Sequence, residues 1–192
     1  MNRALIIVDV QPTFCEGGAL GVDGGNAVAE RIAHFISQQG GHYSLIVSTQ
    51  DWHIDPGEHF SDTPDFVDTW PPHGIAGTAE AELHPALSAV KFDASVKKGQ
   101  HAAAYSGFEG MADDGRTLGE ILTAAEVEEV DVAGIAESHC VKETALDALK
   151  AGFGARVIYD LTVPVDHEQG EAARTEMVIA GVVYVPSEEA AF

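Results

Sequence analysis

The sequence predicts one α/β domain, a three-layer α/β/α sandwich in which helices cover both faces of a six-stranded, mostly parallel sheet. Three observations support this fold class. Apolar strand-like runs alternate with helix-like stripes, an order typical of parallel strands joined by helices. Polar residues follow several of these strands directly, as in folds that bind ligands at the carboxyl ends of parallel strands. The length of 192 residues is most simply that of one domain covering residues 1–192.

Six segments are expected to be strands. The run ALIIV at residues 4–8 is continuously apolar, which is typical of a strand covered on both faces. The segment at 89–93 is the weakest of the six and is assigned as the third strand. The expected strands are residues 4–8, 45–49, 89–93, 130–135, 155–161 and 182–185.

Helices are expected between these strands. Residues 26–39 carry an apolar stripe at helical spacing and end before two glycines. Thr117 and Glu120 form the pattern of a capping box, which predicts a short helix from that point. Two further helices are expected, one with an apolar stripe from 141 to a stop at 152, and one after a capping pattern at 166–169.

Two long stretches, residues 50–85 and 94–116, show no regular pattern. Loops of this length are uncommon in compact domains and are usually functional or disordered. Both stretches contain aromatic residues and histidines, so we expect ordered functional loops.

The composition excludes several classes of protein. The net charge is −21, from 31 acidic and 10 basic residues, with no visible basic patch, so we expect no nucleic-acid partner. No apolar run approaches the roughly 20 residues that span a bilayer, and the first ten residues lack the long apolar region of a secretory signal. Cys15 and Cys140 are too few for a disulfide framework. These features predict a cytoplasmic protein with no membrane partner.

One of the irregular stretches contains the ligand types of a divalent-metal site. Asp51 and His53 alternate in an Asp-x-His pattern, which places both side chains on one side of an extended segment. His59 and His73 follow within the same loop, where Pro and Gly residues allow the chain to turn back. Imidazoles with a carboxylate suit zinc, iron or manganese. The alternative is a set of unrelated surface histidines in an acidic loop.

Other polar residues sort to the same end of the predicted strands. In open parallel sheets the ligand crevice lies at the carboxyl ends of the strands. This sorting therefore predicts a binding crevice at one edge of the sheet. The residues that follow the first four strands in order are Asp9, then Asp51 and His53, then Lys97 and Lys98, then Cys140.

Cys140 is the candidate nucleophile at that edge. It lies in GIAESHCV, where Ser138 is expected to cap a helix whose positive terminus would favour a thiolate. Asp9 could act as the general base, and a lysine could pair with it. Spacing leaves the choice between Lys97 and Lys98 open. The alternative for Cys140 is a small buried thiol without chemistry.

Several motifs together resemble the nicotinamidase/pyrazinamidase family of the isochorismatase-like cysteine hydrolases. They occur in family order from about residue 3 to 185. They are VDVQPTFCEGG at 8–18, DWH at 51–53 with a histidine at 59, WPPH at 70–73, KG at 98–99, AYSGF at 104–108 and GIAESHCV at 134–141. The resemblance implies the strand order 3-2-1-4-5-6.

The resemblance also implies a role for each matching residue. Cys140 would be the nucleophile, Asp9 its base and later acid, and Lys98 the cation that orients Asp9. The backbone amides of Ala136 and Cys140 would form the oxyanion hole beside a cis peptide between Ile135 and Ala136. The metal ligands would be Asp51, His53, His59 and His73, and the pocket would be lined by Phe14, Trp70, Tyr105 and His139.

The function implied is metal-dependent hydrolysis of nicotinamide to nicotinate and ammonia through a cysteine thioester, with pyrazinamide as a second substrate. It implies one divalent metal ion (zinc, iron or manganese), a role in nicotinamide recycling toward NAD, and a monomer or small homo-oligomer. Two alternatives stay open: another isochorismatase-like hydrolase acting on isochorismate, carbamoyl or ureido substrates, and a metal-binding protein without catalysis.

The chain departs from the family pattern beside the nucleophile. Glu137 and Ser138 stand where a Thr-Asp pair is usual. If Glu137 pointed inward, its charge would raise the pKa of Cys140.

Overall fold

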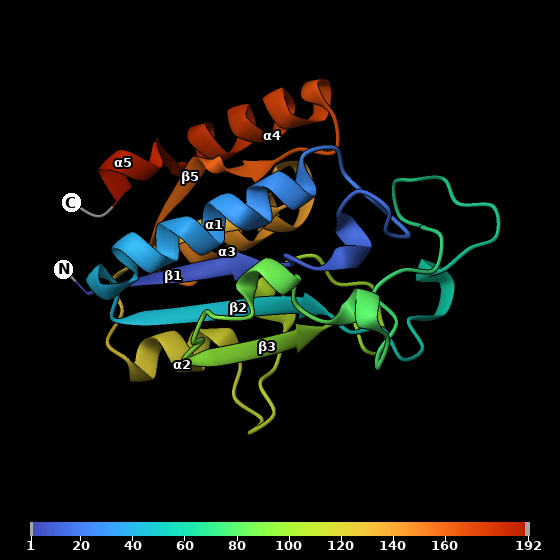
Figure 1. Cartoon of the computed structure of the whole chain (residues 1–192), viewed down its shortest axis with the longest axis horizontal. Helices are drawn as coiled ribbons and strands as arrows, with labels where there is room; N and C mark the ends of the chain where they lie inside the picture. Colours follow the sequence, from blue (N-terminus) through green and yellow to red (C-terminus); the bar gives the residue numbers. More distant parts are fainter. Residues whose placement is uncertain (1, 191–192) are drawn as a thin grey trace.

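A six-stranded sheet, all parallel, forms the centre of the computed structural model, which describes residues 2–190 (Figure 1). The strand order is β3-β2-β1-β4-β5-β6. The expected fold class and strand order are confirmed. The strands are β1 Arg3–Val8, β2 Leu45–Asp51, β3 Ala94–Lys98, β4 Glu129–Ile135, β5 Gly154–Val163 and β6 Val183–Val185.

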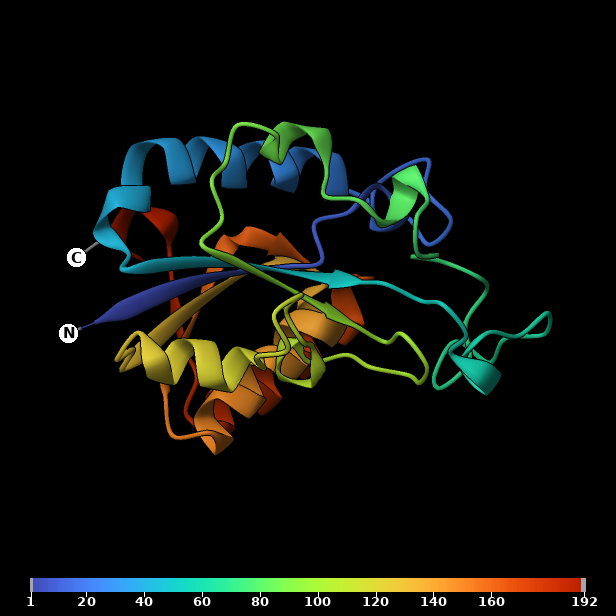
Figure 2. The same ribbon diagram turned by 90° about the horizontal axis from the view of Figure 1, so that it is seen from below.

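Helices cover both faces of this sheet, and Figure 2 shows α1 on one side and α2 on the other. Alternate residues of β1 explain the two layers: Ile6 belongs to the core under α2, α3 and α4, and Ile7 to the core under α1 and α5. Both side chains are fully buried. The helices are α1 Gly25–Gln39, α2 Leu118–Ala124, α3 Lys142–Lys150, α4 His167–Ala180 and α5 Ser187–Ala190.

Both predicted capping patterns are confirmed. Thr117 and Glu120 form a reciprocal capping box at the start of α2. The Asp166 side chain accepts a hydrogen bond from the amide of Gln169 at the start of α4. Each cap satisfies amide groups that have no partner within the helix.

The third strand was placed wrongly at residues 89–93. Val90 and Phe92 pack against the core beneath α1, and Asp93 bonds to the backbone of Ile46 through its carboxylate and its own amide. The strand itself is Ala94–Lys98, at the edge of the sheet. An edge strand needs few apolar residues. The polar residues of this segment therefore did not indicate a strand in the sequence. The stretch at 94–116 is therefore not irregular throughout.

The long segment after β2 extends beyond the carboxyl ends of the strands and turns back through short 3-10 turns (Figure 1). It places the predicted metal ligands at that end of the sheet. Among residues 2–190, no helix has both the length and the apolar character required to cross a bilayer.

Removal of core volume at the centre of β1 is predicted to destabilise the fold. Ile6→Ala should lower the free energy of unfolding by about 2–5 kcal/mol, because the lost side chain is fully buried and leaves a cavity. Ile179→Ala on the outer face of α4, where the side chain is 81% exposed, should change it by less than about 0.5 kcal/mol. Urea unfolding followed by circular dichroism measures both values, and equal midpoints would contradict the core assignment.

Candidate active site

Strand ends bring the candidate catalytic side chains to one place. Asp9 follows β1 directly, with a left-handed backbone (φ 47°) that is unusual for a residue other than glycine. Its amide donates to the carbonyl of Thr49, and the Thr49 hydroxyl donates to Asp9 Oδ1 at 2.7 Å. These bonds to β2 hold the fully buried carboxylate at the carboxyl ends of the strands.

Lys98, the last residue of β3, lies at the centre of the buried charges. Its Nζ is 2.8 Å from Asp9 Oδ2, bonds to Asp51 Oδ1, and lies 3.8 Å from Cys140 Sγ. Lys97 faces the other way, with its Nζ 4.2 Å from the centre of the Trp52 ring. The geometry therefore selects Lys98 as the partner of Asp9.

The electrostatics of this group favour an ammonium between two acids. Burial disfavours the charged lysine, but Asp51 and Asp9 together hold the pKa of Lys98 well above its usual value. Burial also opposes ionisation of Asp51, but Lys98 and the adjacent imidazoles of His53 and His73 bring the pKa of that carboxyl well below its usual value. For Asp9, burial outweighs Lys98 and raises the pKa.

Cys140 lies in a short π-helical turn, Glu137–Val141, between β4 and α3. Burial raises the pKa of its thiol well above the usual value, and Lys98 offsets this only in part. The helix terminus was expected to favour a thiolate, but burial is the largest influence on the pKa of this thiol and acts in the opposite direction. Ser138 does not cap the turn either, since its hydroxyl accepts a hydrogen bond from the amide of Val165.

The backbone before the nucleophile has an unusual path. The peptide bond between Ile135 and Ala136 is cis. The carbonyl of Ala136 then accepts the amides of His139 and Val141 at 3.0 and 3.1 Å, which closes the turn. Cys140 is thereby presented at the end of β4, beside Lys98.

Three buried histidines converge next to this group. The ligand atoms of His53, His59 and His73 all lie within 4.8 Å of one another. His53 Nδ1 pairs with the carbonyl of Gly99 and His73 Nδ1 with that of Pro71, at 2.6 and 2.7 Å, which leaves the Nε2 atoms of both rings for a ligand.

Asp51 joins the histidines to the lysine. While one of its carboxylate oxygens bonds to Lys98, Oδ2 lies 3.3 Å from His53 Nε2 and 3.5 Å from His73 Nε2. His53 Nε2 and His59 Nδ1 are buried without a hydrogen-bond partner. Buried nitrogens without partners are costly, so this donor set fits a divalent metal ion. Three imidazoles and a carboxylate suit zinc, iron or manganese.

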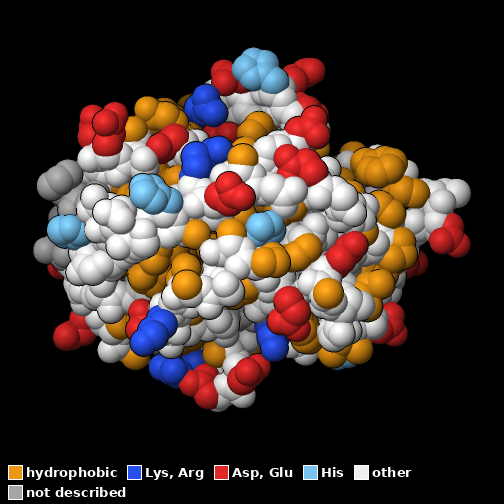
Figure 3. Space-filling model, in the orientation of Figure 1, with side chains coloured by type: hydrophobic (Ala, Val, Ile, Leu, Met, Phe, Trp, Pro, Cys, Tyr) orange, Lys and Arg blue, Asp and Glu red, His pale blue; other side chains and the backbone are white. Residues whose placement is uncertain are grey.

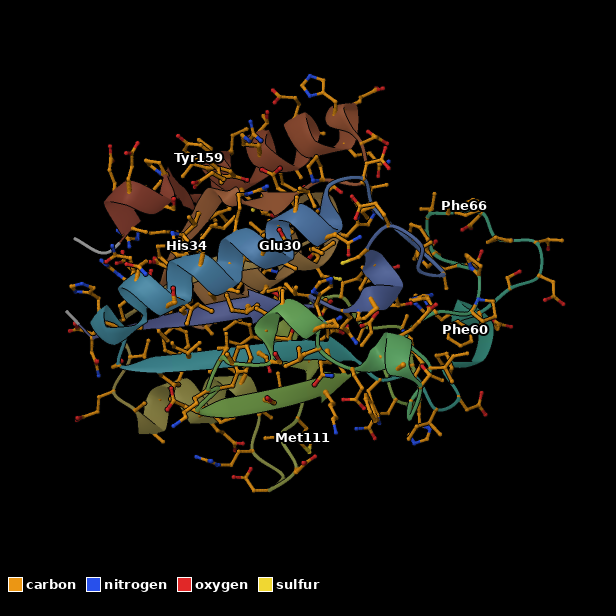
Figure 4. The ribbon with its side chains drawn as sticks, viewed as in Figure 1. Glu30, His34, Phe60, Phe66, Met111 and Tyr159 are labelled. Atoms are coloured by element: carbon orange, nitrogen blue, oxygen red, sulfur yellow. The ribbon has the colours of Figure 1, made fainter. Side chains whose placement is uncertain are left out.

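Two features around the histidines were missed by sequence reasoning. The Phe60 ring, labelled in Figure 4, lies 5.2, 6.1 and 5.4 Å from the rings of His53, His59 and His73. Gln11 brackets Asp51, accepting its amide and donating to its carbonyl. A glutamine three residues after an apolar strand was the available signal for the second of these contacts.

One cavity of about 100 Å³ joins the thiol to the metal-ligand cluster. Cys140 lies in its wall together with Asp51, His59 and His73. Trp70 Nε1 donates to the Tyr105 hydroxyl at 3.1 Å, which fixes two aromatic walls against each other. The four pocket residues expected from the sequence, Phe14, Trp70, Tyr105 and His139, all line it, and so do Leu20, Val22, Ala104 and Val165, which were not expected.

Comparison with known proteins agrees with this geometry. The isochorismatase domain model matches residues 3–189, which is nearly the whole chain. The chain belongs to the isochorismatase family. The resemblance noted from the sequence motifs is thus confirmed at the family level.

Similar members of the isochorismatase family include nicotinamidases. A curated nicotinamidase/pyrazinamidase of Mycobacterium tuberculosis is 48% identical over 96% of this chain and 99% of its own length. A crystal structure of PnC1 from L. infantum in complex with nicotinate matches with a TM-score of 0.85 at 36% identity, covering 97% of this chain and 93% of its own. A pyrazinamidase of Pyrococcus horikoshii in complex with zinc matches with a TM-score of 0.82 at 35% identity, covering 97% and 99%.

The histidine cluster is predicted to bind one divalent ion per chain. His59→Ala should weaken zinc or manganese binding by at least about 10-fold, since even partners that only orient a ligand cost 10–100-fold. His34→Ala on the exposed side of α1 serves as the matched control and should bind normally. Calorimetric titration of the metal-free protein measures both affinities. Equal affinities for the two variants would contradict the site.

Proposed function

We propose that this protein is a metal-dependent amidase that hydrolyses nicotinamide to nicotinate and ammonia through a thioester on Cys140. The observation that carries the proposal is the single cavity in which the thiol, backed by Asp9 and Lys98, meets the metal-ligand cluster. The nicotinamidases among the similar proteins support the same substrate.

In the proposed acylation step, Cys140 Sγ attacks the carboxamide carbon while Asp9 takes the thiol proton. Burial raises the pKa of the Asp9 carboxyl, which makes it a stronger base, and it also raises the pKa of the Cys140 thiol. The transfer moves one negative charge from Asp9 toward the substrate, while Lys98 stays beside both groups. The buried ammonium thus stabilises the charge before and after the transfer.

The carbonyl oxygen becomes negative as the sulfur–carbon bond forms. We assign the backbone amides of Ala136 and Cys140 as its donors, and one such donor is worth about 2.7–4 kcal/mol. Asp9 then returns its proton to the departing nitrogen, which leaves as ammonia. In deacylation, water attacks the thioester carbon and gives one proton to Asp9. The carbon–sulfur bond breaks, Asp9 returns that proton to sulfur, and the acid leaves as nicotinate after giving its remaining proton to solvent.

The aromatic residues Phe14, Trp70, Tyr105 and His139 are proposed to hold the flat ring. Asp51 and the three histidines would hold a divalent ion, which when bound supplies a coordination position for the ring nitrogen. A substrate held at both ends places its carboxamide at the sulfur, and such orientation lowers the entropic part of the barrier.

Finer expectations complete the proposal. Pyrazinamide, which has a similar ring and the same carboxamide, is proposed as a second substrate. We also propose a cytoplasmic protein that recycles nicotinamide, acting as a monomer or small homo-oligomer. Acidic side chains are scattered over the face in Figure 3 with few basic ones, which disfavours a nucleic-acid partner.

Two alternatives are less well supported. Another hydrolase of the family, acting on isochorismate, carbamoyl or ureido compounds, would not need the buried histidines in its cavity wall. A metal-binding protein without catalysis would not need a buried Lys98 beside a buried thiol and Asp9. The combined site favours the amidase.

Removal of the nucleophile is predicted to abolish turnover. Cys140→Ala should lower ammonia release from nicotinamide by at least about 10³-fold, because no other thiol among the described residues lines the cavity. Cys15→Ala removes the other buried thiol and should retain activity. A coupled ammonia assay on the metal-loaded protein measures both variants. Full turnover by Cys140→Ala would rule out covalent catalysis by this sulfur.

Removal of the metal is predicted to reduce turnover of nicotinamide strongly while the fold persists. Dialysis against a chelator should lower activity by at least about 10-fold, and added zinc or manganese should restore it. Circular dichroism before and after dialysis controls for unfolding. Undiminished turnover with no bound metal, together with hydrolysis of a ureido or carbamoyl compound, would favour the other hydrolase.

A further inference from the structure

The turn that carries Cys140 contains a buried acidic residue that the proposed reaction does not use. Glu137 follows Ala136 directly and is 1% exposed. Burying a carboxylate is expensive unless it is paired and hydrogen-bonded. A carboxylate at this position therefore requires hydrogen-bond partners. These partners are residues far from Glu137 in the sequence.

The partners of Glu137 come from α4 and β6. Arg174 on α4 donates to Oε1 from Nε and Nη2, at 3.2 and 3.1 Å, and from Nη2 to Oε2 at 3.3 Å. The hydroxyl of Tyr184 on β6 donates to Oε1 at 3.1 Å. The guanidinium lies over the Tyr184 ring, 5.4 Å from its centre. A planar guanidinium fixes a carboxylate in direction as well as in distance.

The side chain of Glu137 therefore points away from the sulfur, and the possibility that it faces inward is wrong. The main charges that act on the thiol are those of Lys98, Asp9 and Asp51. Glu137 thus influences the reaction through the backbone that it holds and not through its own charge.

A second bond ties the same turn to the segment before α4. The Ser138 hydroxyl accepts the amide of Val165 at 3.1 Å and lies 2.9 Å from His139 Nδ1. At Gly170 in α4, an added Cβ would meet Pro164 at 2.7 Å and come within 3.7 Å of Glu137 Oε2. The missing side chain of Gly170 therefore makes room for Pro164, the residue before the Val165 amide that bonds to Ser138.

We infer that Glu137 is a positioning residue for the proposed amidase: it holds the backbone between Ala136 and Cys140 against α4 and β6, so that the amides serving the carbonyl oxygen keep one position. The inference rests on the proposed function and deepens it. Oxyanion stabilisation depends on donor distance, and a misplacement of about 1 Å can cost about 10²-fold in rate. Glu137 itself does not contact the substrate.

The test compares two carboxylates that bind the same arginine. Glu137→Gln and Arg174→Met remove the ion pair of the buried Glu137 carboxylate, whereas Glu171→Gln removes only the exposed carboxylate 3.2 Å from Arg174 Nη1. With metal-loaded protein and nicotinamide, the first two should lose about 10-fold in kcat with KM within about twofold. Glu171→Gln should behave as the unaltered protein. Unchanged kcat in both Glu137→Gln and Arg174→Met would overturn the inference.

Affinity for pyridine-3-carbaldehyde separates positioning from general damage. The thiol adds to the aldehyde: the sulfur–carbon bond forms, the carbonyl π pair moves to oxygen, and that oxygen takes the proton lost by sulfur. This adduct uses the oxyanion donors, whereas bound nicotinate forms no bond to sulfur. Aldehyde affinity should fall by the same factor as kcat, with nicotinate affinity unchanged. A fall in kcat without a fall in aldehyde affinity would overturn the inference.

Milder variants cover a failure to fold. Tyr184→Phe removes one hydrogen bond and leaves the ion pair, and Arg174→Lys keeps the charge. Both variants should show smaller losses in kcat and in aldehyde affinity. If neither variant loses kcat or aldehyde affinity, the inference is overturned. Absence of ammonia release by the unaltered protein would contradict the proposed function alone, because aldehyde affinity still reports on Glu137.

Discussion

One buried ammonium group holds the two halves of the site together. Lys98 Nζ bonds to Asp51, which lies beside the histidines, and to Asp9, the proposed general base. All three charged side chains are almost completely excluded from water. Loss of one partner from such a group typically costs about 3–5 kcal/mol, because an uncompensated charge stays buried. The proposed metal ligands and the proposed nucleophile are therefore linked through a single cation.

The parallel sheet explains why a lysine serves this purpose. Asp51 and Lys98 are direct neighbours in the register of β2 and β3, and Asp9 lies beyond them at the end of β1. Adjacent strands are about 4.8 Å apart, so a side chain on β3 must extend across β2 to reach a group on β1. The long stem of lysine can do this and carry its charge into the interior. The strand order thus explains why a long cationic side chain is needed and why it stands at the end of β3.

Local patterns in the sequence were sufficient to predict much of this arrangement. A continuous apolar run marked β1, and residue spacing marked the histidine loop, because buried strands and ligand sets leave direct traces in sequence. The edge strand β3 escaped because its exposed face is polar. The raised pKa of Cys140 and the partners of Glu137 escaped as well, since desolvation and contacts with α4 depend on chain segments far away in the sequence.

The most direct test of the coupling compares two neighbouring lysines by nicotinamide turnover. Lys98→Met removes the buried ammonium, and Lys97→Met removes its half-exposed neighbour. With folding checked by circular dichroism, the account predicts a loss in kcat of at least about 10²-fold for Lys98→Met and a value within about twofold of the unaltered protein for Lys97→Met. Equal turnover by the two variants would contradict it.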